Sequence, residues 1–152
     1  KSAVVEQITT AAVVHFATHG LLDDFGTDIP GALALTPTEG DAGFLTADEI
    51  FVLPLSAQLV VLSACDTGRG KITGDGVVGL SRSFLTAGVD SVVVSLWSVP
   101  DEATALLMTE FYRQLQRQPN RAVALQQAML VTRDRYPHPY HWAAFSLFGE
   151  AR

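Results

Sequence analysis

The sequence has little charge and a single cysteine. Charged side chains make up 17% of its 152 residues, compared with about 25% in an average soluble domain. Apolar residues make up 48%, and this content excludes an intrinsically disordered chain. One cysteine cannot form an internal disulfide, so we expect a reducing, cytoplasmic environment. The role of that thiol, Cys65, is the main question that the composition raises.

Other signals are also missing. No apolar run approaches the roughly 20 residues that a membrane-spanning helix needs. The first residues do not have the apolar core of a secretory signal peptide. Ten lysines and arginines stand against 16 aspartates and glutamates, and the net charge of −6 argues against a nucleic-acid-binding surface. We therefore expect no contact with a membrane or with nucleic acid.

Short apolar runs alternate with amphipathic stretches, which is typical of a parallel α/β sheet. Strands are predicted over 11–17, 31–35, 58–63, 90–96 and 142–148. Helices are predicted over 2–8, from Thr46 with Glu49 as its capping-box partner, over 75–87, over 104–115 with Tyr112 in its apolar stripe, and from Asn120 onward. Residues 35–41 are compatible with a β-hairpin over a cleft, but the sequence leaves this open. Right-handed crossovers place the helices on both faces of a mostly parallel sheet.

His19 and Cys65 each follow a predicted buried strand. Ligands of such sheets bind beyond the carboxyl ends of the strands, so both side chains stand at the functional edge if the two strands are neighbours. A free thiol has a pKa of about 8.5 and needs a nearby base to become a nucleophile, and His19 is the candidate. The N–H groups of Gly20 and Cys65 are candidates for an oxyanion hole. On spacing alone, a buried and inert cysteine is the alternative.

Several segments together resemble the CHAT domain, a caspase-like cysteine peptidase domain that is often joined to tetratricopeptide repeats. The match runs in order from Val13 to Gly149, and it includes Phe16-Ala-Thr-His-Gly, Leu62-Ser-Ala-Cys-Asp-Thr-Gly, Gly76-Val-Val-Gly-Leu-Ser-Arg, Leu96-Trp-Ser-Val-Pro-Asp and Tyr140-His-Trp-Ala-Ala-Phe. The resemblance implies a three-layer caspase–hemoglobinase fold and peptide hydrolysis by a dyad of His19 and Cys65, without a cofactor. Caspase-like domains usually have more chain before the histidine. Residues 1–152 are therefore expected to be the carboxyl-terminal portion of a catalytic domain from a larger protein.

The resemblance also bears on the substrate. The caspase signature around the nucleophile is not met, because Asp66 follows Cys65. The stretch that ends at Asp101 is similar to one in separases, distant relatives. A carboxylate at Asp101 or Asp66 can pair with arginine or lysine, so we expect cleavage of one specific protein partner after a basic residue. For Asp101, a helix N-cap is the alternative.

Other motifs weigh against other kinds of site. The segment Gly68-Arg-Gly-Lys-Ile-Thr-Gly lacks the spacing of a phosphate-binding loop. His15 is predicted to be a core histidine, and no metal site is expected because His15 and His19 share a strand and not a zinc-binding helix. Ser63 does not stand in the elbow motif of serine hydrolases. The resemblance implies gating by flanking repeats or a sensor in the same protein. The alternative function is a catalytically silent binding or signalling module.

Overall fold

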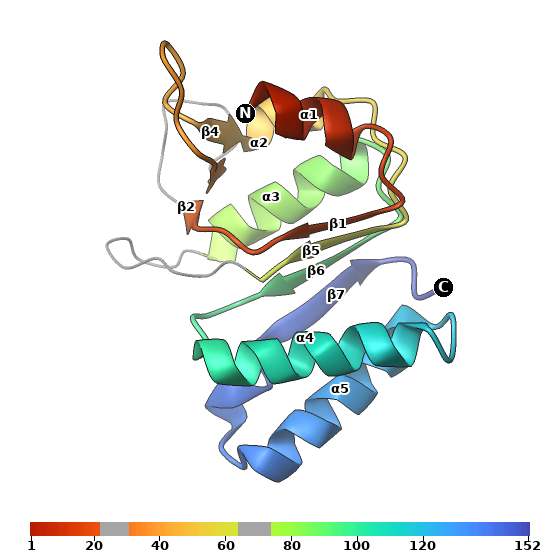
Figure 1. Ribbon diagram of the computed structural model, residues 1–152. Helices are drawn as coiled ribbons and strands as arrows, with labels where there is room; N and C mark the ends of the chain where they lie inside the picture. Colours follow the sequence, from red (N-terminus) through yellow and green to blue (C-terminus); the bar gives the residue numbers. More distant parts are fainter. Residues whose placement is uncertain (22–30, 64–73) are drawn as a thin grey trace.

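The computed structural model describes residues 1–21, 31–63 and 74–152, and for 74–77 only the main chain. Its main sheet has the order β1-β5-β6-β7, with the strands Val13–Phe16, Leu59–Leu62, Ser91–Ser95 and Phe145–Gly149 (Figure 1). The first three strands of this order run parallel, and β7 runs antiparallel to β6. Every residue of β5 and β6 is buried, as expected for strands covered on both faces. The predicted α/β fold with a mostly parallel sheet is confirmed.

Helices cover both faces of the main sheet. On one side lie α1 (Ser2–Ile8), α2 (Ala47–Phe51) and α3 (Gly74–Thr86), and on the other lie α4 (Asp101–Leu115) and α5 (Arg121–Arg135) (Figure 1). Side chains alternate along each strand, so Val60 packs in the core on the α3 side and Val61 packs in the core on the α4 side. The first core also contains Phe84 of α3, which is fully buried with its ring centroid 6.0 Å from that of Phe16.

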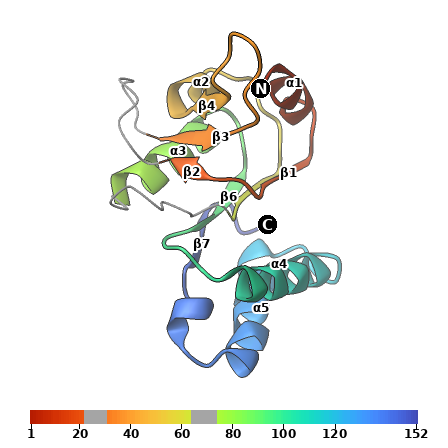
Figure 2. The ribbon, with the colours of Figure 1, turned by 60° about the vertical axis from the view of Figure 1, so that its left-hand side comes forward.

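A second, smaller sheet stands beside the main one (Figure 2). It is antiparallel and consists of β2 (Gly20–Leu21), β3 (Ala32–Ala34) and β4 (Phe44–Thr46). The strand predicted over 31–35 is confirmed, but its partners β2 and β4 were not predicted. The open question of a hairpin is also answered, because the chain turns back between β3 and β4 with a bridge between Thr38 and Asp41. Gly40 and Gly43 permit the turn, since their φ angles are +81° and +79°.

Local signals explain where several elements begin and end. The Thr46–Glu49 capping box that opens α2 is present, and the Asn120 side chain accepts the Val123 N–H at the start of α5, both as predicted. The last strand begins at Phe145 and not at 142, because residues Pro139–His141 form a short 3-10 helix, η1. Across the described residues, no helix is long and apolar enough to span a bilayer.

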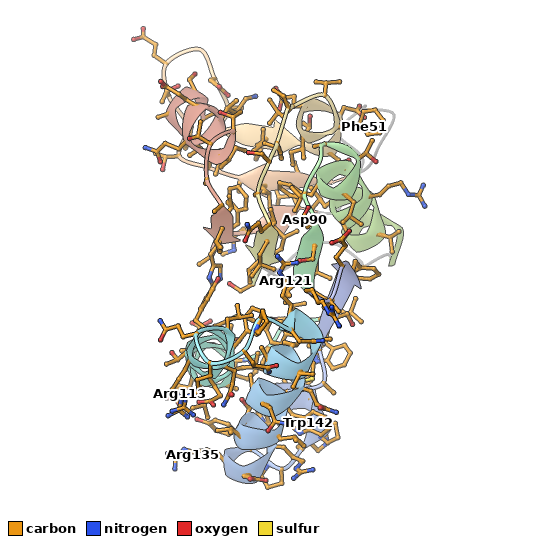
Figure 3. All side chains as sticks on the ribbon, turned by 90° about the vertical axis from the view of Figure 1, so that its right-hand side faces the viewer. Phe51, Asp90, Arg113, Arg121, Arg135 and Trp142 are labelled. Atoms are coloured by element: carbon orange, nitrogen blue, oxygen red, sulfur yellow. The ribbon has the colours of Figure 1, made fainter. Side chains whose placement is uncertain are left out.

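The start of α5 is tied to the start of β6. Arg121, which is largely buried, directs its guanidinium toward Asp90 with an N–O separation of 4.0 Å (Figure 3). Its main-chain N–H donates to the carbonyl of Ala151 at 2.6 Å, and its side chain donates to the carbonyl of Arg152. The Asp90 carboxylate and the Arg152 carbonyl offset the energetic cost of burying the Arg121 guanidinium.

Candidate functional site

A cleft of about 730 Å³ opens at the carboxyl ends of the parallel strands. One wall follows β1 and the turn after it, the floor includes the residue after β5, and the opposite wall is the first half of α4 with the loop before it. The described lining residues are His15, Ala17, Thr18, His19, Ser63, Ser95, Ser98, Val99, Pro100, Asp101, Thr104, Ala105, Met108 and Tyr140. This is the edge at which the sequence predicted ligand binding.

His19 lies in the turn between the two sheets. Its side chain is exposed to the cleft. Its main-chain carbonyl accepts the Ala34 N–H at 2.9 Å, and the Thr18 hydroxyl donates to the Ala34 carbonyl. The N–H and the carbonyl of Ala34 in the small sheet therefore both bind the turn. These two hydrogen bonds fix the place from which the imidazole of His19 projects.

The strands that precede His19 and Cys65 are direct neighbours. Phe16 of β1 pairs with Leu62 of β5, and the two candidate residues each follow by three positions. The pairing continues one residue further, because the Ser63 N–H donates to the Phe16 carbonyl at 3.2 Å. Cys65 and Asp66 lie outside the described residues. The condition stated for the two residues is thus met, because β1 and β5 are neighbours, and the structure describes the chain after β5 up to Ser63.

Gly20, an oxyanion-hole candidate, is the first residue of β2 and is buried. Gly20 stands opposite Leu33 in the antiparallel pairing of β2 with β3. Because the Ala34 N–H donates to the His19 carbonyl, Gly20 and Leu33 form a pair that is not hydrogen-bonded to each other. Main-chain groups alternate in direction along a strand, so the Gly20 N–H points away from β3. It is therefore not used by the small sheet.

Asp101 stands at the cleft as the first residue of α4. The N-cap of that helix is Pro100, so the interpretation of Asp101 as the N-cap is wrong by one position. A carboxylate in the first turn still interacts favourably with the helix dipole. Among the described lining residues there is no lysine or arginine. The fixed charge that they contribute is therefore negative.

His15 is not a core residue, and that prediction is wrong. Its side chain is exposed along the cleft, where Nε2 lies 2.8 Å from Ser63 Oγ and Nδ1 lies 3.0 Å from the Tyr112 phenol oxygen. Desolvation by the surrounding atoms lowers the pKa of His15 below its usual value. Burial likewise raises the pKa of Tyr112 to about 12. His15 shares one face of β1 with the exposed Val13, and the alternation along this strand was the signal that could have found it.

Comparison with known proteins agrees with these motifs. The family model of the CHAT domain matches residues 1–150. Tetratricopeptide repeat protein 28 of Mus musculus is 33% identical over 183 residues, which cover 98% of this chain and 8% of that protein. Tetratricopeptide repeat protein 28 of Homo sapiens is 32% identical over 183 residues, covering 98% of this chain and 7% of that protein. The chain therefore spans less than a tenth of the length of these relatives.

Proposed function

The chain belongs to the CHAT domain family, and from that premise we propose that it is a cysteine endopeptidase with His19 and Cys65 as its catalytic dyad. One observation carries the proposal. Two neighbouring parallel strands lead to the two residues at the same offset, and His19 faces a cleft at that edge. A nucleophile and a base on adjacent strand ends can approach each other without rearrangement of the sheet.

The chemistry uses groups of this chain alone. The Cys65 thiolate attacks the carbonyl carbon of the scissile peptide, and the N–H groups of Gly20 and Cys65 stabilise the oxyanion that forms. His19, protonated when it took the thiol proton, gives that proton to the leaving amine as the C–N bond breaks. Water, activated by His19, then hydrolyses the thioester and restores the thiol. The direction of the Gly20 N–H, away from β3, supports its share in this scheme.

The substrate side chain that we propose is arginine or lysine, at the residue before the cleaved bond. Asp101 gives the described part of the cleft a negative wall, and Asp66 is the second candidate for this contact. A guanidinium can pair with a carboxylate through two parallel hydrogen bonds. An acidic substrate residue would meet like charge and no cationic partner among the described lining residues.

We further propose that the site acts on one protein partner and is gated by another region of the same protein. The relatives that match this chain are named tetratricopeptide repeat proteins, and the matched part is a small fraction of each. Repeats of that kind present extended concave binding surfaces, which suits the role of a sensor.

The test is alkylation of Cys65 by iodoacetamide in the full-length protein, with and without its activator. We expect rapid alkylation that falls in His19→Ala and is unchanged in Gln126→Ala, a control at an exposed position of α5 outside the lining of the cleft. Cys65→Ala should remove all hydrolysis of peptide libraries. A thiol that reacts at the same slow rate with or without His19, even with activator bound, would instead support the silent binding module.

A matched pair of substitutions tests the substrate specificity. Asp101 and Glu102 are neighbouring acids in the first turn of α4, but of the two only Asp101 lines the cleft. Asp101→Asn should reduce the preference for an arginine reporter over a glutamine reporter by roughly 5- to 30-fold, the worth of about 1 to 2 kcal/mol for a partly solvated charged contact. Glu102→Gln should leave that preference intact. Equal turnover of arginine and aspartate reporters by the unmodified protein would contradict the basic specificity.

A further inference from the structure

Three polar side chains form a hydrogen-bonded series on the α4 side of the sheet. It connects β1 to the end of β5 on one side and to α4 on the other. Ser63 follows β5, His15 lies on β1, and Tyr112 lies on α4. The imidazole is the centre of the series, with its Nε2 2.8 Å from the serine oxygen and its Nδ1 3.0 Å from the phenol oxygen. The last contact joins residues 97 positions apart in the sequence and spans the space between the edge strand and the helix.

The elements that His15 joins are those that carry the candidate site. β1 leads to His19, β5 leads toward Cys65, and α4 begins at Asp101. His15 lies one residue before the end of β1, and His19 lies in the turn that follows the strand. The contacts of His15 therefore lie at the carboxyl end of β1, and His15, His19 and Ser63 all line the cleft.

The protonation states of Ser63, His15 and Tyr112 allow both hydrogen bonds at the same time. A neutral imidazole has one N–H donor and one acceptor nitrogen, and each hydroxyl can take either role. The phenol can donate to Nδ1 while Nε2–H donates to the serine oxygen, or both bonds can run in the opposite sense. The lowered pKa of His15 and the raised pKa of Tyr112 keep both groups neutral near pH 7, so either arrangement satisfies every partner.

The pair of Ser63 and His15 does not form a second reaction centre. A serine nucleophile leaves its proton on the imidazole, and the resulting cation needs an anionic partner at the other nitrogen, which is a carboxylate in serine hydrolases. Here that partner is the Tyr112 phenol, and its pKa of about 12 means that it carries no charge at neutral pH. The geometry supports a role in holding elements in place.

We propose that His15 is a positioning residue of the peptidase site, which fixes the end of β5 through Ser63 and the helix α4 through Tyr112. The inference rests on the proposed function. The contact with Ser63 holds the residue that follows β5, two positions before the nucleophile. The contact with Tyr112, about three turns from Asp101, sets the distance of the helix from β1.

Three substitutions at one position separate the two contacts in the full-length protein. His15→Ala removes both, and we expect it to lower kcat on an arginine reporter and the alkylation rate of Cys65 by roughly 10- to 100-fold, with a smaller change in KM. The amide of His15→Gln reaches about as far as Nε2, so this variant should recover the alkylation rate. The amide of His15→Asn stands near the position of Nδ1. That variant should keep the preference for arginine over glutamine reporters and should not recover the rate.

Val13→Ala is the matched control, because Val13 lies on the same face of β1 and is 49% exposed. It should behave as the unmodified protein, and thermal unfolding should show that all variants are folded. Wild-type kcat and alkylation in His15→Ala, or equal losses in the Ala and Gln variants, would overturn the inference. A Cys65 alkylation rate that does not depend on His19 would refute the dyad instead. In that case hydrogen exchange at the Ser63 N–H decides the matter: faster exchange in His15→Ala supports positioning, and unchanged exchange refutes it.

Discussion

The half-buried phenol of Tyr112 makes the stability of the fold depend on pH in the alkaline range. Burial raises the pKa of Tyr112 to about 12 from an ordinary value of 10.0. Both the folded and the unfolded chain hold the proton below pH 10, so the stability is complete there. Above pH 10 the unfolded chain loses the proton first, and the stability declines until the pH passes the folded-state value. At about 1.36 kcal/mol for each pKa unit the full shift is worth roughly 2 kcal/mol, and solvent screening of the half-buried phenol reduces the expected fall in unfolding free energy between pH 9 and pH 11.5 to about 1 kcal/mol.

Urea unfolding at these two pH values measures the effect. The quantity to compare is the loss of unfolding free energy in the unmodified protein and in Tyr112→Phe, which keeps the ring and has no proton to lose. Tyr112→Phe should lose about 1 kcal/mol less than the unmodified protein. Tyr140→Phe, at a side chain that is 45% exposed, should lose as much as the unmodified protein. The reasoning fails if Tyr112→Phe weakens with pH as steeply as the unmodified chain.

Three further predictions concern the core and the helices. Phe84→Ala should lower the free energy of unfolding by about 3 to 5 kcal/mol in urea titrations, because the side chain is fully buried. Asn120→Ala should lower it by about 1 kcal/mol through loss of the α5 cap, and Asn120→Asp should preserve the cap. Burial by itself would raise the pKa of Glu110, but hydrogen bonds from Gln114 and Arg113 hold it below its usual 4.5. The stability from Glu110 is thus complete above pH 4.5 and is lost as the pH falls through the lower folded-state pKa, so Glu110→Gln should flatten that acid slope in unfolding midpoints.

The main sheet could be predicted because its central strands are short apolar runs buried on both faces. Ser91–Ser95 and Leu59–Leu62 carry that signal over their whole length. The strand Gly20–Leu21 has only two residues, too few to show any periodicity, and its existence depends on pairing with β3. The antiparallel direction of β7 could not be predicted from the local sequence pattern either, because the path of the preceding chain decides it.

For the site, the position of His19 directly after a strand was enough to place it at the cleft, although the prediction that this strand is buried was wrong: β1 is an edge strand of which only Phe16 is buried. The hydrogen-bond partners of His15 could not be predicted in the same way, because one of them is Tyr112, which is 97 positions away on α4. Tyr112 belongs to the apolar stripe of α4, and its neighbour Phe111 is fully buried as the stripe predicts. The phenol is only half-buried and reaches the imidazole on β1. A single sequence contains no record of such a pairing.

The reversed direction of β7 has a consequence for how the cleft is bounded. Its first residue, Phe145, pairs with Ser95 at the last position of β6. The chain just before β7 therefore arrives at the edge that carries His19, and Tyr140 lines the cleft. A parallel strand in the same place would bring that segment to the opposite edge of the sheet. The connection between α5 and β7 is thus a part of the cleft wall that can lengthen or change its composition without altering any strand, and the range of accepted substrates can diverge there while the sheet stays the same.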